Sequence, residues 1–97
     1  MPTFIYLTSW TDKGVAEPKT AVDRAQAAVD NLESMGVKIF ETYWTSGDYD
    51  LVMVAECADE ETAYAAQLDM ASRGNVRPTV LRAFDRGEMS SILSKLP

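Results

Sequence analysis

The chain has 97 residues, enough for one domain over 1–97, and its 46% hydrophobic and 25% charged residues are ordinary for a folded protein. Its formal net charge is −6 and its nine Lys and Arg residues are scattered, which argues against binding a nucleic-acid backbone. One cysteine and no histidine exclude an internal disulfide, histidine-based triads, His-ligated zinc and a proximal haem histidine.

Targeting and metal signals are also absent from the sequence. There is no charged-then-apolar leader and no run of about 20 apolar residues, so we expect a cytoplasmic protein without membrane contact. Metal ligands would have to come from carboxylates, carbonyl groups, methionine sulfurs or Cys57 alone, and no EF-hand spacing or glycine-rich phosphate loop occurs. We therefore expect no metal and no cofactor, and we interpret Cys57 as a small buried apolar residue.

The chain opens with a predicted strand over residues 3–10, which are rich in β-branched and aromatic side chains. Both alternating faces of this strand carry apolar groups, so we expect it to be covered on both sides. Residues 12–14 are then expected to make a turn.

A helix is predicted over residues 18–35, where Pro18 suits the first turn and Gly36 is a natural stop. The apolar residues that recur at helical spacing are Val22, Ala25, Val29 and Leu32. A second strand is expected over residues 37–45.

The second half repeats the order strand, helix, strand. A turn at Ser46-Gly47 leads into a strand over 49–56, which again has two apolar faces and forms a hairpin with the preceding strand. A helix capped by Asp59 is expected to run to about Ser72, followed by a strand over 76–84.

A short last helix is predicted over about 86–96, because Asp85 and Glu88 have the spacing of a capping box. The order β-α-β-β-α-β-α predicts an α+β fold of the ferredoxin-like type, with an antiparallel sheet and a C-terminal helix. Right-handed crossovers place both long helices on one face and make strands 3–10 and 49–56 central. The other face is apolar, so we predict a homo-oligomer, a dimer or a multiple of dimers, that buries it.

Four short segments resemble one protein family. They are Met1-Pro2-Thr3, Thr11-Asp12-Lys13-Gly14, Thr45-Ser46-Gly47-Asp48-Tyr49-Asp50-Leu51-Val52, and Gly74-Asn75-Val76-Arg77 taken with Leu81-Arg82-Ala83-Phe84. In this order they are similar to the signature of the GYD-domain family. The resemblance implies a dimeric α/β-barrel protein, related to small monooxygenases, muconolactone-type isomerases and ligand-sensing domains, in a family without an assigned activity.

Candidate ligand-binding residues gather near the start of strand 49–56. Asp48 and Asp50 are either a carboxylate pair for proton transfer or a turn cap and a hydrogen-bonded anchor of the hairpin. The aromatic residues Tyr43, Trp44 and Tyr49, together with Tyr6, either line a pocket or belong to the core or an interface.

Arg77 and Arg82 lie on opposite faces of strand 76–84, so one of them points inward. That arginine makes either a structural ion pair with Asp50 or Glu56 or an anion site. We expect any ligand to bind between the sheet and its helices or at the dimer seam, and the residues proposed to contact it are Tyr43, Trp44, Asp48, Tyr49, Asp50 and Arg82.

Three functions stay open at this point. The protein is a small-molecule binding or sensing module, a cofactor-independent isomerase or monooxygenase with Asp50 or a tyrosine as base, or a purely structural assembly protein. We favour the first.

Overall fold

A computed structural model describes residues 1–97. The elements in chain order are β1 (Thr3–Trp10), α1 (Asp12–Val15), the 3-10 helix η1 (Pro18–Thr20), α2 (Ala21–Ser34), β2 (Lys38–Trp44), β3 (Leu51–Glu56), α3 (Glu60–Ser72), β4 (Val76–Ala83) and α4 (Arg86–Leu93). The predicted turn at 12–14 is a short helix, because the Thr11 hydroxyl caps it by accepting the Gly14 N–H at 3.1 Å.

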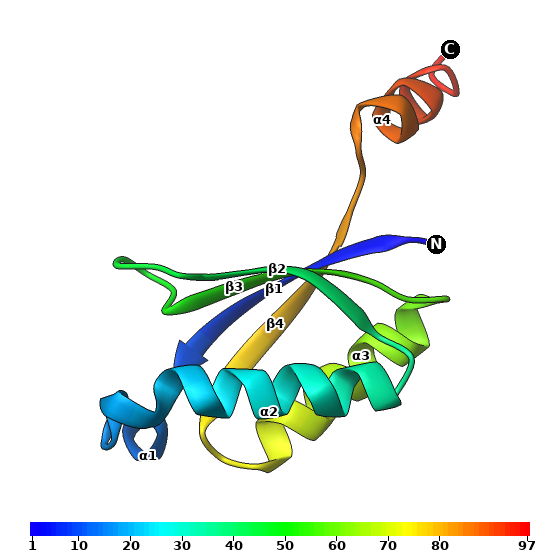
Figure 1. Cartoon of the computed structure of the whole chain (residues 1–97). Coiled ribbons are helices and arrows are strands. Elements are labelled where there is room, and N and C mark those ends of the chain that lie inside the picture. Colours follow the sequence, from blue (N-terminus) through cyan, green and yellow to red (C-terminus); the bar gives the residue numbers. More distant parts are fainter.

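The four strands form one antiparallel sheet in the order β2-β3-β1-β4. Helices α2 and α3 cover one face of this sheet (Figure 1). The predicted ferredoxin-like α+β fold is therefore confirmed, with β1 and β3 at the centre of the sheet.

The ends of the helices follow local signals in the sequence. Asp59 caps α3 by accepting the Thr62 N–H at 2.8 Å, and Asp85 and Glu88 form the predicted capping box of α4. Gly36 and Gly74 end α2 and α3 with positive φ angles of 88° and 83°, a backbone conformation that glycine adopts without steric cost.

The core lies between the sheet and α2 and α3. Alternate residues of the two central strands point into it, because side chains in a strand alternate between faces. The buried residues that form this core are Phe4, Tyr6, Leu32, Val37, Leu51, Met53, Ala55, Cys57, Ala63, Ala66 and Met70.

Helix α2 is rotated relative to the sequence-based expectation. Ala25 and Leu32 are buried as expected, but Val22 is 64% exposed. Ala21, Ala25 and Ala28 face the sheet region instead, so this side of the helix presents methyl groups rather than larger side chains. The stripe through Val22 was therefore wrong at its first position.

Pro78 is tolerated in β4 because β4 is an edge strand. Its neighbour two residues on, Val80, directs its N–H away from β1 and donates to the Gln67 side chain of α3 at 2.7 Å. Alternate residues of a strand point their backbone groups the same way, so the nitrogen of Pro78 also faces the outer edge and no hydrogen bond of the sheet is lost.

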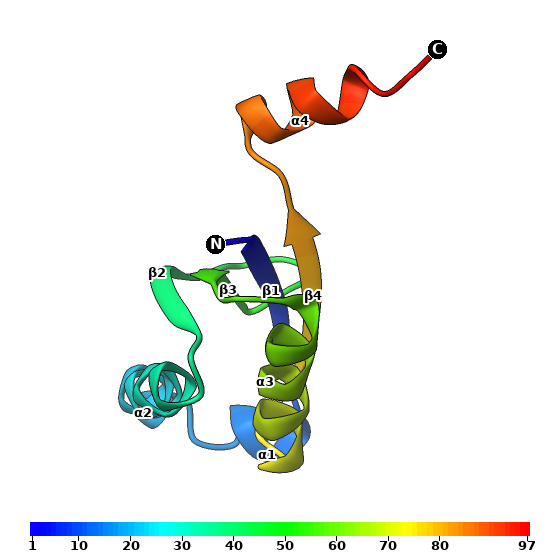
Figure 2. The same cartoon turned by 90° about the vertical axis from the view of Figure 1, so that its right-hand side faces the viewer.

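The second face of the sheet, here called the open face, carries no helix in this chain (Figure 2). Register pairs place its apolar side chains together: Ile5 opposite Val54 and Leu81, and Leu7 and Tyr43 opposite Val52. These residues are half-buried or exposed, in contrast to the buried residues of the helix side.

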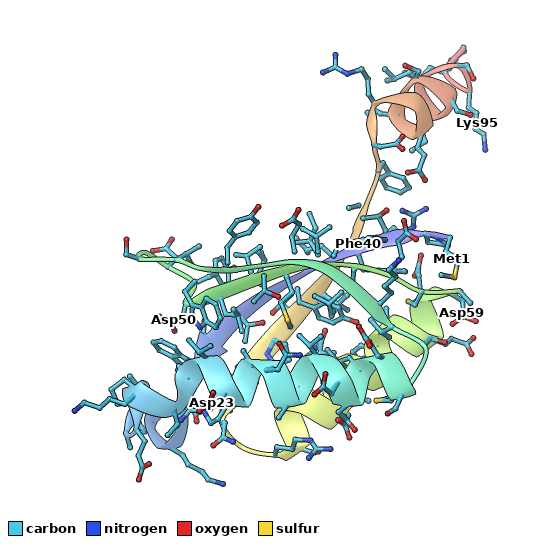
Figure 3. All side chains as sticks on the ribbon, viewed as in Figure 1. Met1, Asp23, Phe40, Asp50, Asp59 and Lys95 are labelled. Carbon is cyan, nitrogen blue, oxygen red and sulfur yellow. The ribbon has the colours of Figure 1, made fainter.

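Helix α4 stands away from the rest of the chain, on the side of the open face (Figures 1 and 2). Lys95 beyond its end and Asp23 on α2 lie on opposite sides of the sheet (Figure 3). The radius of gyration is 14.6 Å, larger than the roughly 12.5 Å expected for a chain of this length. The apolar residues that α4 and its linker leave exposed are Phe84, Met89, Ile92, Leu93 and Leu96.

Candidate functional site

A cavity of about 250 Å³ lies on the helix side of the sheet, under the end where β1 finishes and β3 and β4 begin. Its walls are α2, the sheet, the end of α3 and the loop that follows α3. The residues that line it are Thr8, Trp10, Ala21, Arg24, Ala25, Ala27, Ala28, Asn31, Trp44, Leu51, Met53, Met70, Arg73, Asn75 and Val76.

The cavity exists because α2 faces the sheet with alanines. Four of the lining residues are alanines of this helix, and their methyl groups are too short to fill the space. The spacing of α2 from α3 is fixed by a polar link, in which the Asn31 amide donates to the Asp69 carboxylate at 2.6 Å and Arg73 pairs with the same oxygen at 3.3 Å. The space is therefore bounded by helices that are tied together.

Thr8 is the polar residue of the cavity floor. It is 1% exposed, and its hydroxyl has no hydrogen-bond partner in the structure. Phe4 and Tyr6 precede it on the same inward face of β1, and both are buried. A buried hydroxyl without a partner costs about 1–3 kcal/mol, so Thr8 brings an unused donor and acceptor to the lining of the cavity.

Arg24 supplies positive charge at the cavity wall. Its guanidinium donates to the carbonyl oxygen of Gly14 at 2.7 Å, to the Thr20 hydroxyl at 2.7 Å and to the carbonyl oxygen of Glu17 at 2.9 Å. All three acceptors are neutral, and no carboxylate lies within ion-pair distance of Arg24. The charge is therefore held in place without being neutralised.

Of the six candidate residues, Trp44 is the one that lines this cavity. Trp44 is 42% exposed at the end of β2, so it forms part of the rim. Tyr43 points to the open face, where its hydroxyl donates to Glu41 at 3.1 Å and this hydrogen bond raises the pKa of the tyrosine. Asp48 and Tyr49 are exposed in the hairpin turn.

Asp50 lies at the hairpin end of the sheet (Figure 3), one residue before β3. Its carboxylate accepts the Trp10 N–H at 2.9 Å, and its own N–H donates to the Thr8 carbonyl oxygen at 2.9 Å. Its carbonyl oxygen accepts the Thr45 N–H at 3.0 Å. Asp50 thus ties the hairpin to the end of β1 and holds Trp10 in the cavity wall, while its carboxylate does not line the cavity itself.

Arg82 lies at the other end of β1, because it pairs in register with Phe4 whereas Leu51 pairs with Thr8. Four residues of strand separate these positions, a span of roughly 13 Å. Arg82 makes the structural ion pair that one reading of the sequence anticipated, but its partner is Glu88 of α4 at 3.2 Å and not Asp50 or Glu56. Its guanidinium also stacks on the Phe84 ring, 4.5 Å from the centroid.

Tyr6 and Cys57 belong to the core. The Tyr6 hydroxyl donates to the Ala63 carbonyl oxygen at 2.8 Å, and burial, followed by the nearby Cys57, raises the pKa of the phenol. Cys57 is fully buried as predicted, and burial raises the pKa of its thiol, so the thiolate that reactive cysteines need is disfavoured.

Sequence reasoning missed Thr8, Arg24, Asn31 and Arg73. Thr8 stands at an inward position of an apolar strand, which was a usable signal because a polar residue there must find a partner or a ligand. Arg24 and Asn31 lie on a face of α2 whose rotation is decided by packing, and Arg73 lies just beyond the end of α3.

The comparison with known proteins assigns the family. The model of the GYD domain matches residues 4–93, so the chain belongs to the GYD-domain family, as the segments quoted above predicted. A protein of Thermus thermophilus described as "Glutamine synthetase and cystathionine beta-lyase binding protein" is 38% identical over 84 residues, which are 86% of this chain and 88% of that protein.

None of the helices has the length and apolar composition that spanning a membrane requires.

Proposed function

We propose that the protein is a small-molecule binding module of one domain, residues 1–97, that forms a homo-oligomer through the open face of its sheet. The observation that carries the proposal is the cavity beneath the sheet, with the partnerless Thr8 hydroxyl at its floor. A mostly apolar hollow with a few fixed polar groups is the usual form of a small-molecule site.

The open face supports self-association. Its centre is formed by Ile5, Leu7, Val52 and Val54, whereas the charged residues of the same face lie toward its margins. An apolar centre with a charged rim is the anatomy of protein interfaces. A second copy of the chain is the occupant we propose, since the same apolar face on each copy makes a self-complementary contact.

Helix α4 extends the same surface. It lies on the side of the open face, so a second copy that meets the sheet there also comes close to the apolar stripe of α4 (Figures 1 and 2). The Arg82–Glu88 ion pair holds the base of α4 to the end of β4. Covering this stripe would remove exposed apolar surface that a monomer leaves in water.

Binding of other proteins is the second candidate function. The Thermus relative is described as binding two enzymes, and the exposed apolar side chains of α4 are the observation in this chain that favours such a role. The enzymatic alternative has weaker support, because no carboxylate lines the cavity and the carboxylate of Asp50 is occupied by the Trp10 N–H.

A thermal-shift screen tests the proposed function. The wild-type protein is heated with a panel of neutral, anionic and cationic compounds of about ten heavy atoms, since ligands that bind the native state raise its melting temperature. Ala28→Leu, which places a larger side chain in the cavity, is the matched control. We expect panel members to stabilise the wild type and not this variant, and a panel without effect on the wild type would contradict the proposal.

A further inference from the structure

We infer that the ligand of this cavity is a planar organic monoanion of about ten heavy atoms, whose carboxylate pairs with Arg24 and whose second polar group meets Thr8. This inference rests on the proposed small-molecule function and adds the chemical class of the ligand. Charge, donor geometry and size each bear on it separately.

The charge of the lining is opposite to that of the chain. The chain has 15 acidic and 9 basic residues, yet the charged residues that line the cavity are Arg24 and Arg73, with no Asp or Glu among them. Arg73 is paired with Asp69, so its charge is largely compensated. Arg24 has no such partner and makes the cavity wall attractive to an anion.

The donor geometry of Arg24 suits a carboxylate. A guanidinium has five N–H donors, and its planar fork matches the two oxygens of a carboxylate. Three donors of Arg24 are used by Gly14, Thr20 and Glu17, which fix the side chain in place. The Nε–H and one further N–H have no partner in the structure, so the group is positioned beforehand and still able to bind.

Thr8 is the second polar group that we expect the ligand to contact. Its hydroxyl is buried and unpaired, and the residues around it in the cavity floor, Leu51 and Met53, are apolar. A ligand hydroxyl or carbonyl group is needed to satisfy it, since an apolar ligand would leave the Thr8 hydroxyl without a partner.

Size and wall chemistry define the body of the ligand. A cavity of 150 Å³ in another protein holds benzene, with six heavy atoms, so the present 250 Å³ holds about ten. Trp10 and Trp44 offer aromatic surfaces, and the alanines of α2 give a smooth opposite wall. Aromatic rings stack favourably on such surfaces, and the hydroxybenzoates combine all these features.

Isothermal titration calorimetry tests the class with four kinds of probe: benzoate, the three hydroxybenzoates, neutral benzamide and cationic benzylamine. We expect benzoate to bind about tenfold more tightly than benzamide, because the carboxylate adds charge-assisted hydrogen bonds. At least one hydroxybenzoate should bind more tightly than benzoate. Both tryptophans of the chain line the cavity, so the indole N–H signals of both should shift in NMR spectra recorded during each titration.

Variants assign the contacts. Arg24→Gln should lower benzoate affinity about tenfold and leave benzamide affinity unchanged, and Arg24→Lys, which keeps the charge, should retain part of it. Thr8→Val should remove the advantage of the hydroxybenzoate over benzoate. Arg86→Gln, an exposed arginine at the start of α4, is the control and should change nothing. If Arg24→Gln fails to fold, the comparison of benzoate with benzamide on the wild type still tests whether the site prefers an anion.

The outcomes separate this inference from the proposed function. If benzamide or benzylamine shifts both indole signals and binds as tightly as benzoate, the anionic class is wrong and the small-molecule site stands. If benzoate binds without shifting the indole signals, it binds elsewhere and the inference is overturned. If no compound binds in the calorimeter or in the thermal-shift panel, both proposals fail.

Discussion

Thr8 and the residues before it on β1 illustrate what one hydroxyl changes at an inward strand position. Phe4 and Tyr6 have the same orientation and are buried in the core, and Tyr6 satisfies its hydroxyl on Ala63. The Thr8 hydroxyl has no such acceptor, although Thr8 is one of the residues that line the cavity. The unpaired hydroxyl therefore destabilises the ligand-free protein, and a ligand that supplies a hydrogen-bond partner would remove this cost.

We expect Thr8→Val to raise the free energy of unfolding of the ligand-free protein by about 1 kcal/mol, because the shape is kept and the unpaired hydroxyl is removed. Urea denaturation measures the change. Thr8→Ser, which keeps the hydroxyl at the same position, is the control and should bring no gain in stability. A loss of stability in Thr8→Val would show that the hydroxyl is already satisfied.

Asp50 is expected to act as a structural anchor. Asp50→Ala should lower the free energy of unfolding by about 1–2 kcal/mol, because the Trp10 N–H loses its acceptor. Asp50→Asn should cost less, since its amide oxygen still accepts. Asp48→Ala, on an exposed carboxylate two residues away, is the matched control in chemical denaturation. Equal stability of Asp50→Ala and Asp48→Ala would contradict the anchoring role.

We expect the folded protein to lose stability at alkaline pH because of Tyr6 and Cys57. Both pKa values are raised in the folded chain, so the folded state holds these protons more tightly than the unfolded chain. This contribution is fully present below the unfolded pKa values, about 8.5 for Cys and 10 for Tyr, and is lost as pH rises above them.

Tyr6→Phe tests this pH dependence. At pH 7 it should lower the free energy of unfolding by about 1 kcal/mol through loss of the hydrogen bond to Ala63. Above pH 10 the difference from wild type should shrink, because the wild type then loses stability that the variant never had. The exposed Tyr64→Phe is the control. A difference that stays constant between pH 7 and pH 11 would refute the raised pKa of Tyr6.

At the scale of elements, α2 decides whether the molecule has a cavity. Its sheet-facing alanines leave space that larger residues would fill, and its Asn31 is fixed to Asp69 of α3. This hydrogen bond holds α2 to α3, and α2 also packs on the sheet. The cavity is a property of the helix face and its tether together.

Ala28→Leu should therefore raise the free energy of unfolding by about 1–2 kcal/mol, since added carbon atoms fill existing space. Thermal and urea unfolding of the ligand-free protein measure the gain. Ala65→Leu, on an exposed position of α3, provides the comparison and should have little effect. Destabilisation by Ala28→Leu would mean that the region is already filled.

The sequence predicted the elements well where local chemistry decides them. Caps at Asp59 and Asp85 and the glycines after α2 and α3 act within a few residues, so their effect can be read directly. The order of the elements, with right-handed crossovers, placed β1 and β3 at the centre of the sheet, and the two apolar faces of these strands agree with that position.

The candidate site was harder to predict, because it depends on contacts between distant residues. The rotation of α2, which turns Val22 outward and brings Arg24 to the cavity, follows from its packing on the sheet and α3. Arg82 pairs with Glu88 because α4 begins right after β4. The alternation of side chains along β4 could not predict this contact. Trp44 could be predicted as a site residue, because it ends a strand beside the hairpin.

At the scale of the whole molecule, the open face and α4 leave apolar surface on one side of a chain with an extended shape. We expect Leu7→Glu to convert an assembly of twice or a multiple of 10.7 kDa into a 10.7 kDa monomer, because the charge would be buried at the centre of the interface. Light scattering gives the mass, and circular dichroism checks that the fold is kept.

Val22→Glu is the matched control for that experiment, since it introduces the same charge at an exposed apolar position on the outer side of α2. Its assembly should be unchanged. A wild-type protein that is already monomeric at micromolar concentration, or a Leu7→Glu variant that keeps its mass, would contradict association through the open face.

Native mass spectrometry tests the central claim, a homo-oligomer with a small molecule in the cavity, most directly. For protein kept in saturating benzoate or hydroxybenzoate, we predict a mass of twice 10.7 kDa or a multiple, with one ligand per chain released on activation. Ala28→Leu should give the same assembly without the ligand. A ligand-free monomer of 10.7 kDa from the wild-type protein under these conditions would contradict the account.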